Sequence, residues 1–139
     1  MIEKKEHLYI VFENLLRIKS ECSSDLFSEC GLPDITVKQI EYLRMIDEHG
    51  EVTFSGLAKI TRNSKPTITE MINKFVKMKC VYREKSSDDG RIFYIRLTDK
   101  GQTLARSEEA ALFKLIERMA GSLDEKDVDT LIWILQKVR

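Results

Sequence analysis

The tripeptide Asp89-Gly90-Arg91 places a carboxylate two residues before a guanidinium, inside the polar stretch SSDDGR. Serine, aspartate and glycine favour tight turns, so we expect Arg91 at the tip of a hairpin. Asp89 can hydrogen-bond the planar guanidinium and fix its direction. A protruding arginine can then enter the minor groove of DNA, where the potential is negative. The alternative is an exposed ion pair in a turn, worth less than about 1 kcal/mol.

A second group of polar side chains lies upstream, on a segment that begins at Ser64. Lysine, threonine, glutamate and asparagine side chains can reach base edges in the major groove, and Asn73 could pair bidentately with adenine. The alternative is the solvated face of a surface helix, but the neighbouring Arg91 turn favours contact with DNA. The candidate base-reading residues are Ser64, Lys65, Pro66, Thr67, Thr69, Glu70, Asn73 and Lys74.

Positive charge is concentrated around these two groups. The whole chain has a formal net charge of zero, yet residues 62–100 contain ten Lys/Arg and five acidic residues, a local charge of +5. Such side chains can contact phosphates, which contributes affinity and salt dependence without sequence information. The candidate phosphate contacts are Arg62, Lys77, Lys79, Arg83, Lys85 and Arg96.

The segment from Asn63 to Lys100 must fold so that these side chains point outward. Ser64 is a good N-cap and Pro66 suits a first helical turn, so a helix should begin here. Its core face is predicted to contain Ile68, Met71, Ile72 and Phe75. A short helix should precede it, capped by Thr53 and broken at residues 61–63. Two helices joined in this way form a helix–turn–helix.

After Cys80 the apolar period changes from 3.6 to 2. Val81 to Lys85 and Arg91 to Leu97 are therefore predicted as strands on either side of the SSDDG turn. A β-hairpin that directly follows a helix–turn–helix makes a winged helix. The predicted fold class is mainly α with a small β-hairpin wing.

Helices should flank this part on both sides. Apolar spacing predicts a helix from about Glu6 to Glu29, ended by Gly31 and Pro33. Thr36 and Gln39 form a capping-box pattern for a helix that ends near Gly50.

Downstream, Thr98 should cap one helix from about Asp99 to Ala120, with Gly121 as the break. The last helix should begin at Asp124 and is apolar on more than one face, because Trp133 and Ile134 lie off its main stripe. A small monomer cannot easily bury two faces of a terminal helix, so we expect a second copy of the chain to cover one of them.

Other classes of function find little support. His7 and His49 have no ligand-spaced partners, so no metal is predicted, and no cofactor loop or catalytic constellation is recognisable. Neither a signal peptide nor a membrane span is visible, and three cysteines without close spacing fit a reducing cytoplasm. Cys22 and Cys30 are most simply interpreted as small buried hydrophobes.

Several of these residues carry a resemblance to a known family. Asp89-Gly90-Arg91, followed by Leu97-Thr98-Asp99-Lys100-Gly101, resembles the wing signature of the MarR family, and residues 64–69 resemble the start of its recognition helix. Two positions depart from the pattern: Cys80 stands where a glycine often follows the recognition helix, and Gly56 where an acidic residue is common.

The resemblance implies one MarR-type domain, with residues 1–33 and 101–139 as dimerisation helices and residues 34–100 as the winged helix–turn–helix. It implies a homodimeric regulator that binds a pseudo-palindromic operator in double-stranded DNA, usually as a repressor. Relief would come from a small aromatic or other hydrophobic effector, bound between the dimer helices and the DNA-binding part, or from oxidation of a thiol on the first helix, for which Cys22 is the candidate. A winged helix that docks onto another protein remains the alternative.

Overall fold

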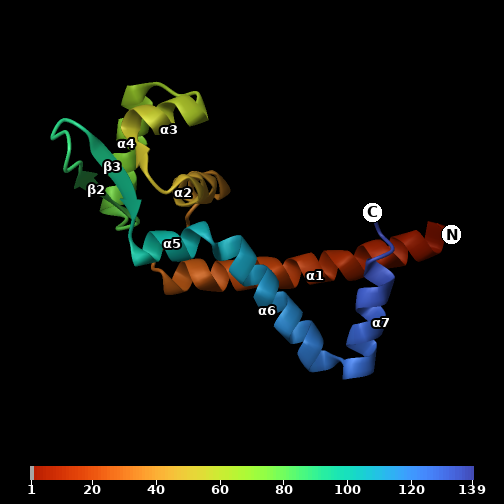
Figure 1. The fold of residues 1–139 in the computed structure, drawn as a ribbon. Coiled ribbons are helices and arrows are strands. Elements are labelled where there is room, and N and C mark those ends of the chain that lie inside the picture. The colour runs from red at the N-terminus through yellow and green to blue at the C-terminus, as the bar shows by residue number, and fades with distance from the viewer. Residues whose placement is uncertain (1) are drawn as a thin grey trace. The chain divides into compact units, whose positions relative to one another are not determined.

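A computed structural model describes residues 2–139 as a mainly helical chain with one small antiparallel sheet (Figure 1). It divides into two compact units. The winged unit is Leu26–Ser107, and the helical unit combines the residues up to Asp25 with Glu108–Arg139. The elements in chain order are α1 (Ile2–Glu29), α2 (Val37–His49), β1 (Val52–Thr53), α3 (Phe54–Thr61), α4 (Lys65–Lys77), β2 (Val81–Lys85), β3 (Phe93–Leu97), α5 (Asp99–Ala105), α6 (Ser107–Ser122) and α7 (Glu125–Leu135).

The predicted helix starts in the winged unit are observed with their caps. Thr36 Oγ1 accepts a hydrogen bond from the Gln39 amide at 3.1 Å, and the Gln39 side chain accepts from the Thr36 amide at 2.9 Å. This reciprocal pair satisfies two amides that the first turn of α2 would otherwise leave open. Thr53 caps α3 with a single bond, in which its Oγ1 accepts from the Gly56 amide at 3.0 Å.

A three-stranded sheet with strand order β1-β3-β2 completes the winged unit. Val52 pairs with Ile95, while Val81 pairs with Leu97. Strand β1 was not predicted, because two residues are too few to show an alternating pattern. The central strand β3 buries Ile95 against the helices, and Figure 1 shows β2 and β3 as the hairpin that follows α4.

One continuous core joins these elements. Every member of the main cluster of fully buried apolar residues lies between Ile40 and Ala105. Helix α4 contributes Ile68, Ile72 and Phe75 as predicted, and Met71 packs against their edge. The core therefore fixes one side of α4 and leaves its polar side exposed.

Two details of the C-terminal prediction are wrong. The single helix expected from about Asp99 to Ala120 is two helices, because the backbone turns at Arg106 (φ −102°, ψ 14°). Arg106 pairs with Asp47 of α2 through hydrogen bonds of 3.0 and 3.1 Å, next to the buried Ser107. The break coincides with these tertiary contacts, and the sequence has no Gly or Pro at this position that would have indicated it. Gly121 does not end α6, which continues to Ser122.

The helical unit contrasts with this arrangement. Ala111 and Leu115 of α6 are its buried residues, and α1 and α7 have none among the described positions. Large apolar side chains are instead exposed on all three helices, and those at least half exposed are Ile2, Leu8, Tyr9, Ile10, Leu16, Phe113, Ile132 and Trp133. Within residues 2–139, no helix combines the length and apolar character that crossing a membrane requires.

Candidate nucleic-acid interface

Helix α4 presents a continuous polar surface. Six of the eight predicted base-reading residues line it, together with one predicted phosphate contact: Lys65, Pro66, Thr69, Glu70, Asn73, Lys74 and Lys77. They are all exposed, because the 3.6-residue period turns Ile68, Ile72 and Phe75 into the core. The surface combines hydrogen-bond donors and acceptors with three ammonium groups, which suits the edges of bases and the phosphates beside them.

Ser64 and Thr67, the other two predicted residues, are engaged with each other at the start of α4. Ser64 Oγ accepts from the Thr67 amide at 3.3 Å and lies 2.8 Å from Thr67 Oγ1. The Ser64 hydroxyl is therefore the helix cap, and the Thr67 hydroxyl is its hydrogen-bond partner. The turn before the cap is held by Asn63, whose Nδ2 donates to Tyr42 Oη at 3.2 Å. This contact fixes the start of α4 relative to α2.

Arg91 lies at the exposed end of the hairpin, with 92% of its side chain accessible. Asp89 Oδ1 accepts two hydrogen bonds from it, one from the amide at 3.0 Å and one from Nε at 3.3 Å. The turn is tightened further by Ser86 Oγ, which accepts from the amides of Asp88 and Asp89. Asp89 thus orients Arg91 as predicted while leaving both terminal nitrogens available to a partner.

Thr98 and Gly101 of the sequence signature tie α5 to the end of α4. Thr98 Oγ1 donates to the carbonyl of Lys79 at 2.6 Å and accepts from the Gly101 amide at 3.0 Å, while the Thr98 amide donates to the carbonyl of Cys80 at 2.9 Å. A Cβ on Gly101 would lie 1.9 Å from that Cys80 oxygen. The signature glycine is therefore required by the close approach of two backbones.

The position that favours glycine after α4 is Lys79, which corrects the expectation for Cys80. Lys79 has φ +62°, in the left-handed region, while Cys80 is fully buried and its amide donates to the carbonyl of Phe75. This is the C-terminal cap in which the residue after the helix turns left-handed. Burial raises the pKa of the Cys80 thiol, a trend that Lys100 opposes and Cys30 reinforces. The thiol is thus disfavoured as a nucleophile.

The predicted phosphate contacts fall into two groups. Arg62, Lys77, Lys79 and Lys85 are exposed, and Arg62 has φ +57° at the end of α3. Arg96 instead donates to Glu84 at 3.2 Å, Glu51 at 3.4 Å and the Gly50 carbonyl at 3.4 Å. Partial burial lowers its pKa, but the hydrogen bonds and charges of these carboxylates outweigh that effect and raise it. Arg96 therefore links strands β2 and β3 to the segment before β1.

Arg83, the remaining residue of this set, bridges the wing and α4. Its Nη2 donates to Oδ1 of Asn73, and its guanidinium carbon lies 5.2 Å from the centre of the Phe54 ring. Sequence reasoning missed this contact, because no local pattern connects residues ten positions apart on a helix and a strand.

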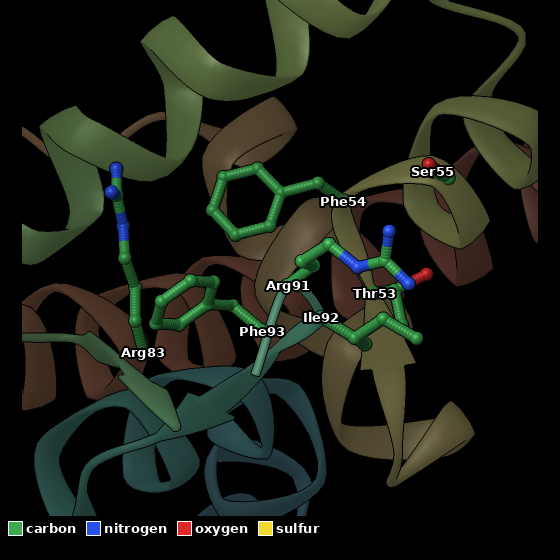
Figure 2. A pocket seen from close by; sticks show the side chains of 7 residues that line it. All are labelled: Thr53, Phe54, Ser55, Arg83, Arg91, Ile92 and Phe93. Atoms are coloured by element: carbon green, nitrogen blue, oxygen red, sulfur yellow. The ribbon is translucent and has the colours of Figure 1, made fainter. Parts of the chain in front are cut away.

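A hollow of about 450 Å³ lies between the wing and the start of α3, lined by Thr53, Phe54, Ser55, Arg83, Arg91, Ile92 and Phe93. Figure 2 shows the rings of Phe54 and Phe93 between the side chains of Arg83 and Arg91. The rings therefore separate the arginine that reaches α4 from the arginine at the wing tip.

The three cysteines of the chain are free thiols. Cys22 and Cys30 are half-buried and unbonded to each other, and Cys80 is buried. Among residues 2–139, no group of three His, Cys, Asp or Glu side chains is arranged to hold a metal ion.

The model of the MarR family matches residues 35–93, which contain α2, α3, α4 and the first part of the wing. The HTH-type transcriptional regulator FarR of Neisseria gonorrhoeae is 29% identical over 93 residues, covering 67% of this chain. This chain spans 56% of FarR, a little over half its length. The relatives found are transcriptional regulators, in agreement with the prediction that the chain is not an enzyme.

Two solved structures establish the fold over nearly the whole chain. YusO of Bacillus subtilis is 17% identical, with a TM-score of 0.67 over 99% of this chain and 96% of YusO. The MepR–DNA complex of S. aureus is 20% identical, with a TM-score of 0.67 over 95% of each chain. These likenesses confirm a winged helix–turn–helix with additional terminal helices.

Proposed function

We propose that this chain is a transcriptional regulator of the MarR type, with a winged helix–turn–helix, and that it binds a pseudo-palindromic operator in double-stranded DNA as a homodimer. The observation that carries this proposal is the polar face of α4 beside an exposed, pre-oriented Arg91 on the same compact unit. A helix of this kind fits the major groove, while the wing arginine fits the adjacent minor groove.

Different side chains would have different tasks. Lys65, Thr69, Glu70, Asn73 and Lys74 would reach base edges from α4, with Pro66 in van der Waals contact. Ser64 and Thr67 would hold the helix start against the DNA. Arg62, Lys77, Lys79 and Lys85 would contact phosphates, which predicts binding that weakens steeply with salt.

The homodimer is proposed from the helical unit. Exposed apolar side chains on α1, α6 and α7 have no internal core to enter, and a second copy offers the same surfaces for mutual burial. A twofold axis would place two copies of α4 in successive major grooves, about 10 bp apart centre to centre.

Repression relieved by a small hydrophobic or aromatic effector is the regulatory mode we propose. A cavity of about 310 Å³ within the helical unit supports it, lined by Leu15, Ile18, Leu115, Arg118, Met119, Ser122 and Leu123. Its size is at the lower end for small-molecule sites, and Arg118 could pair with an acidic group. A bound ligand would act by favouring a dimer conformation whose recognition helices no longer fit the operator.

The experiment is an operator selection from a randomised duplex pool, followed by fluorescence anisotropy with Arg91→Ala. We expect affinity for the selected duplex to fall by roughly tenfold or more, with an unchanged dimer mass, because the wing loses its charge-assisted minor-groove contact. Lys126→Ala, which removes an exposed lysine of α7, is the matched control and should leave affinity unchanged. Selection of no sequence would instead favour a winged helix that docks onto another protein.

A further inference from the structure

We infer that Arg83 is a positioning residue that sets the base preference of Asn73, an inference that rests on the proposed function and refines it. Arg83 belongs to β2 of the wing and Asn73 to the exposed face of α4, and the guanidinium donates to the asparagine Oδ1. The sequence alone assigned Arg83 to the phosphates and Asn73 to adenine. Their contact changes both assignments.

The direction of this hydrogen bond follows from the chemistry of the pair. A guanidinium has five N–H donors and no acceptor, so the side of the carboxamide that faces it must be the carbonyl oxygen. The Asn73 NH₂ group is then the part left to meet a partner. Bidentate recognition of adenine needs that same oxygen to accept from N6–H₂ while the amide donates to N7. The charged donor on Oδ1 disfavours this arrangement.

The base edge that suits a donor alone is that of guanine. Its major-groove edge presents two acceptors, N7 and O6, and no donor. Asn73 held by Arg83 should therefore prefer guanine to adenine at the position it contacts. The guanidinium charge also polarises the carboxamide and strengthens its N–H donors.

Arg83 is itself held in place from a second element. Its guanidinium carbon lies 5.2 Å from the ring centre of Phe54, the first residue of α3. Figure 2 shows the Arg83 side chain extending past the rings of Phe93 and Phe54. A cation over an aromatic face gains attraction and loses freedom of movement. The arginine is thereby kept directed at α4 before DNA arrives, which is the condition for a specificity effect.

A positioning role and a phosphate contact predict different results. A lost phosphate contact weakens binding uniformly across sequences and reduces the salt slope by about 1. A lost positioning contact removes the preference at one base position and leaves the salt slope nearly unchanged. The test measures the affinity of the dimer for four versions of the wild-type-selected operator, which differ only in the base pair that Asn73→Ala identifies as its contact.

We expect the wild type to prefer guanine over adenine there by about tenfold, the scale of one good base contact. Arg83→Ala should reduce that ratio to about twofold or less, and Arg83→Lys should retain part of it because the ammonium is still a charged donor. Arg83→Ala added to Asn73→Ala should change the ratio little further, since both remove the same interaction. Lys85→Ala, two residues along β2, is the matched control: it should weaken all four duplexes equally.

If Arg83→Ala weakens binding to all four duplexes equally and reduces the salt slope by about 1, the inference is overturned and Arg83 is a phosphate contact. An adenine preference in the wild type would overturn it as well. If the wild type selects no duplex at all, the proposed function and this inference both fail. If it selects a duplex but shows no guanine preference at this position, only the inference fails, so the two failures are distinguishable. Thermal unfolding of each variant confirms that the compared proteins are folded.

Discussion

The two units of this chain handle apolar surface in opposite ways. The winged unit buries its aliphatic and aromatic residues around Leu43, Ile72 and Phe75, whereas the helical unit leaves residues such as Phe113 and Trp133 exposed. Burial contributes roughly 25 cal/mol for each Å² removed from water. The winged unit thus has a core of its own, whereas the proposed dimer would cover part of the apolar surface of the helical unit. In the proposed function, DNA reading and assembly would therefore belong to different units.

The largest expected effect tests the core of the winged unit. Phe75 is 1% exposed, so Phe75→Ala should reduce the free energy of unfolding by about 3–5 kcal/mol, through lost burial and the cavity left behind. Urea unfolding at fixed protein concentration measures it. The adjacent Val76 is 40% exposed, and Val76→Ala should cost less than about 1 kcal/mol. Similar losses for the two variants would contradict the assignment of the core face of α4.

The next effect concerns the contact between α5 and the end of α4. Gly101→Ala should destabilise the protein by about 1–3 kcal/mol, because the new Cβ meets the Cys80 carbonyl and the helix must shift. Gly121→Ala meets no atom within 4 Å and lies inside α6, so it should stabilise by about 0.5–1 kcal/mol. Opposite signs for these two substitutions in thermal unfolding are the prediction. A neutral Gly101→Ala would contradict the close approach.

The corresponding test of the helical unit changes assembly more than folding. Trp133 is 61% exposed, so Trp133→Ala should disturb the fold of a single chain little. We expect it to weaken the dimer by about 1–3 kcal/mol, since large aromatic residues dominate interfaces. Sedimentation velocity of a dilution series would show the shift to monomer. Lys126→Ala on the same helix is the control, and an unshifted dimer would exclude Trp133 from the interface.

The smallest effect comes from the left-handed Lys79. Lys79→Gly removes the Cβ strain at φ +62° and should stabilise the winged unit by up to about 1 kcal/mol. It also removes one charge, so the salt slope of DNA binding should fall by about 1 if this residue contacts phosphate. Destabilisation would contradict the backbone assignment. An unchanged slope would remove Lys79 from the phosphate contacts.

Local chemistry explains what the sequence could predict. The capping box of Thr36 and Gln39, the Ser64 cap with Pro66, and the Asp89–Arg91 turn each depend on residues within a few positions, and all are observed. The features that were missed depend on distant contacts. The break at Arg106 is associated with Asp47, and the Arg83–Asn73 bridge joins a strand to a helix. A periodic pattern cannot reveal which exposed side chains will meet.

Lys79 illustrates an intermediate case. The chain must turn left-handed after α4, and lysine gives no signal of that requirement, whereas glycine would have done so. The family resemblance placed the expected glycine at Cys80, one residue after the position whose backbone is left-handed. In the structure Lys79 is the left-handed residue, and the side chain of Cys80 enters the core.

The proposed separation of DNA binding from dimerisation is tested most directly by the mass of the protein–DNA complex. Sedimentation equilibrium with the selected operator should give two chains per duplex, and the free protein at micromolar concentration should have the same dimeric mass. Phe113 and Trp133 on the helical unit would then be protected from solvent in both states. A folded monomer in solution that binds one chain per operator would contradict the account.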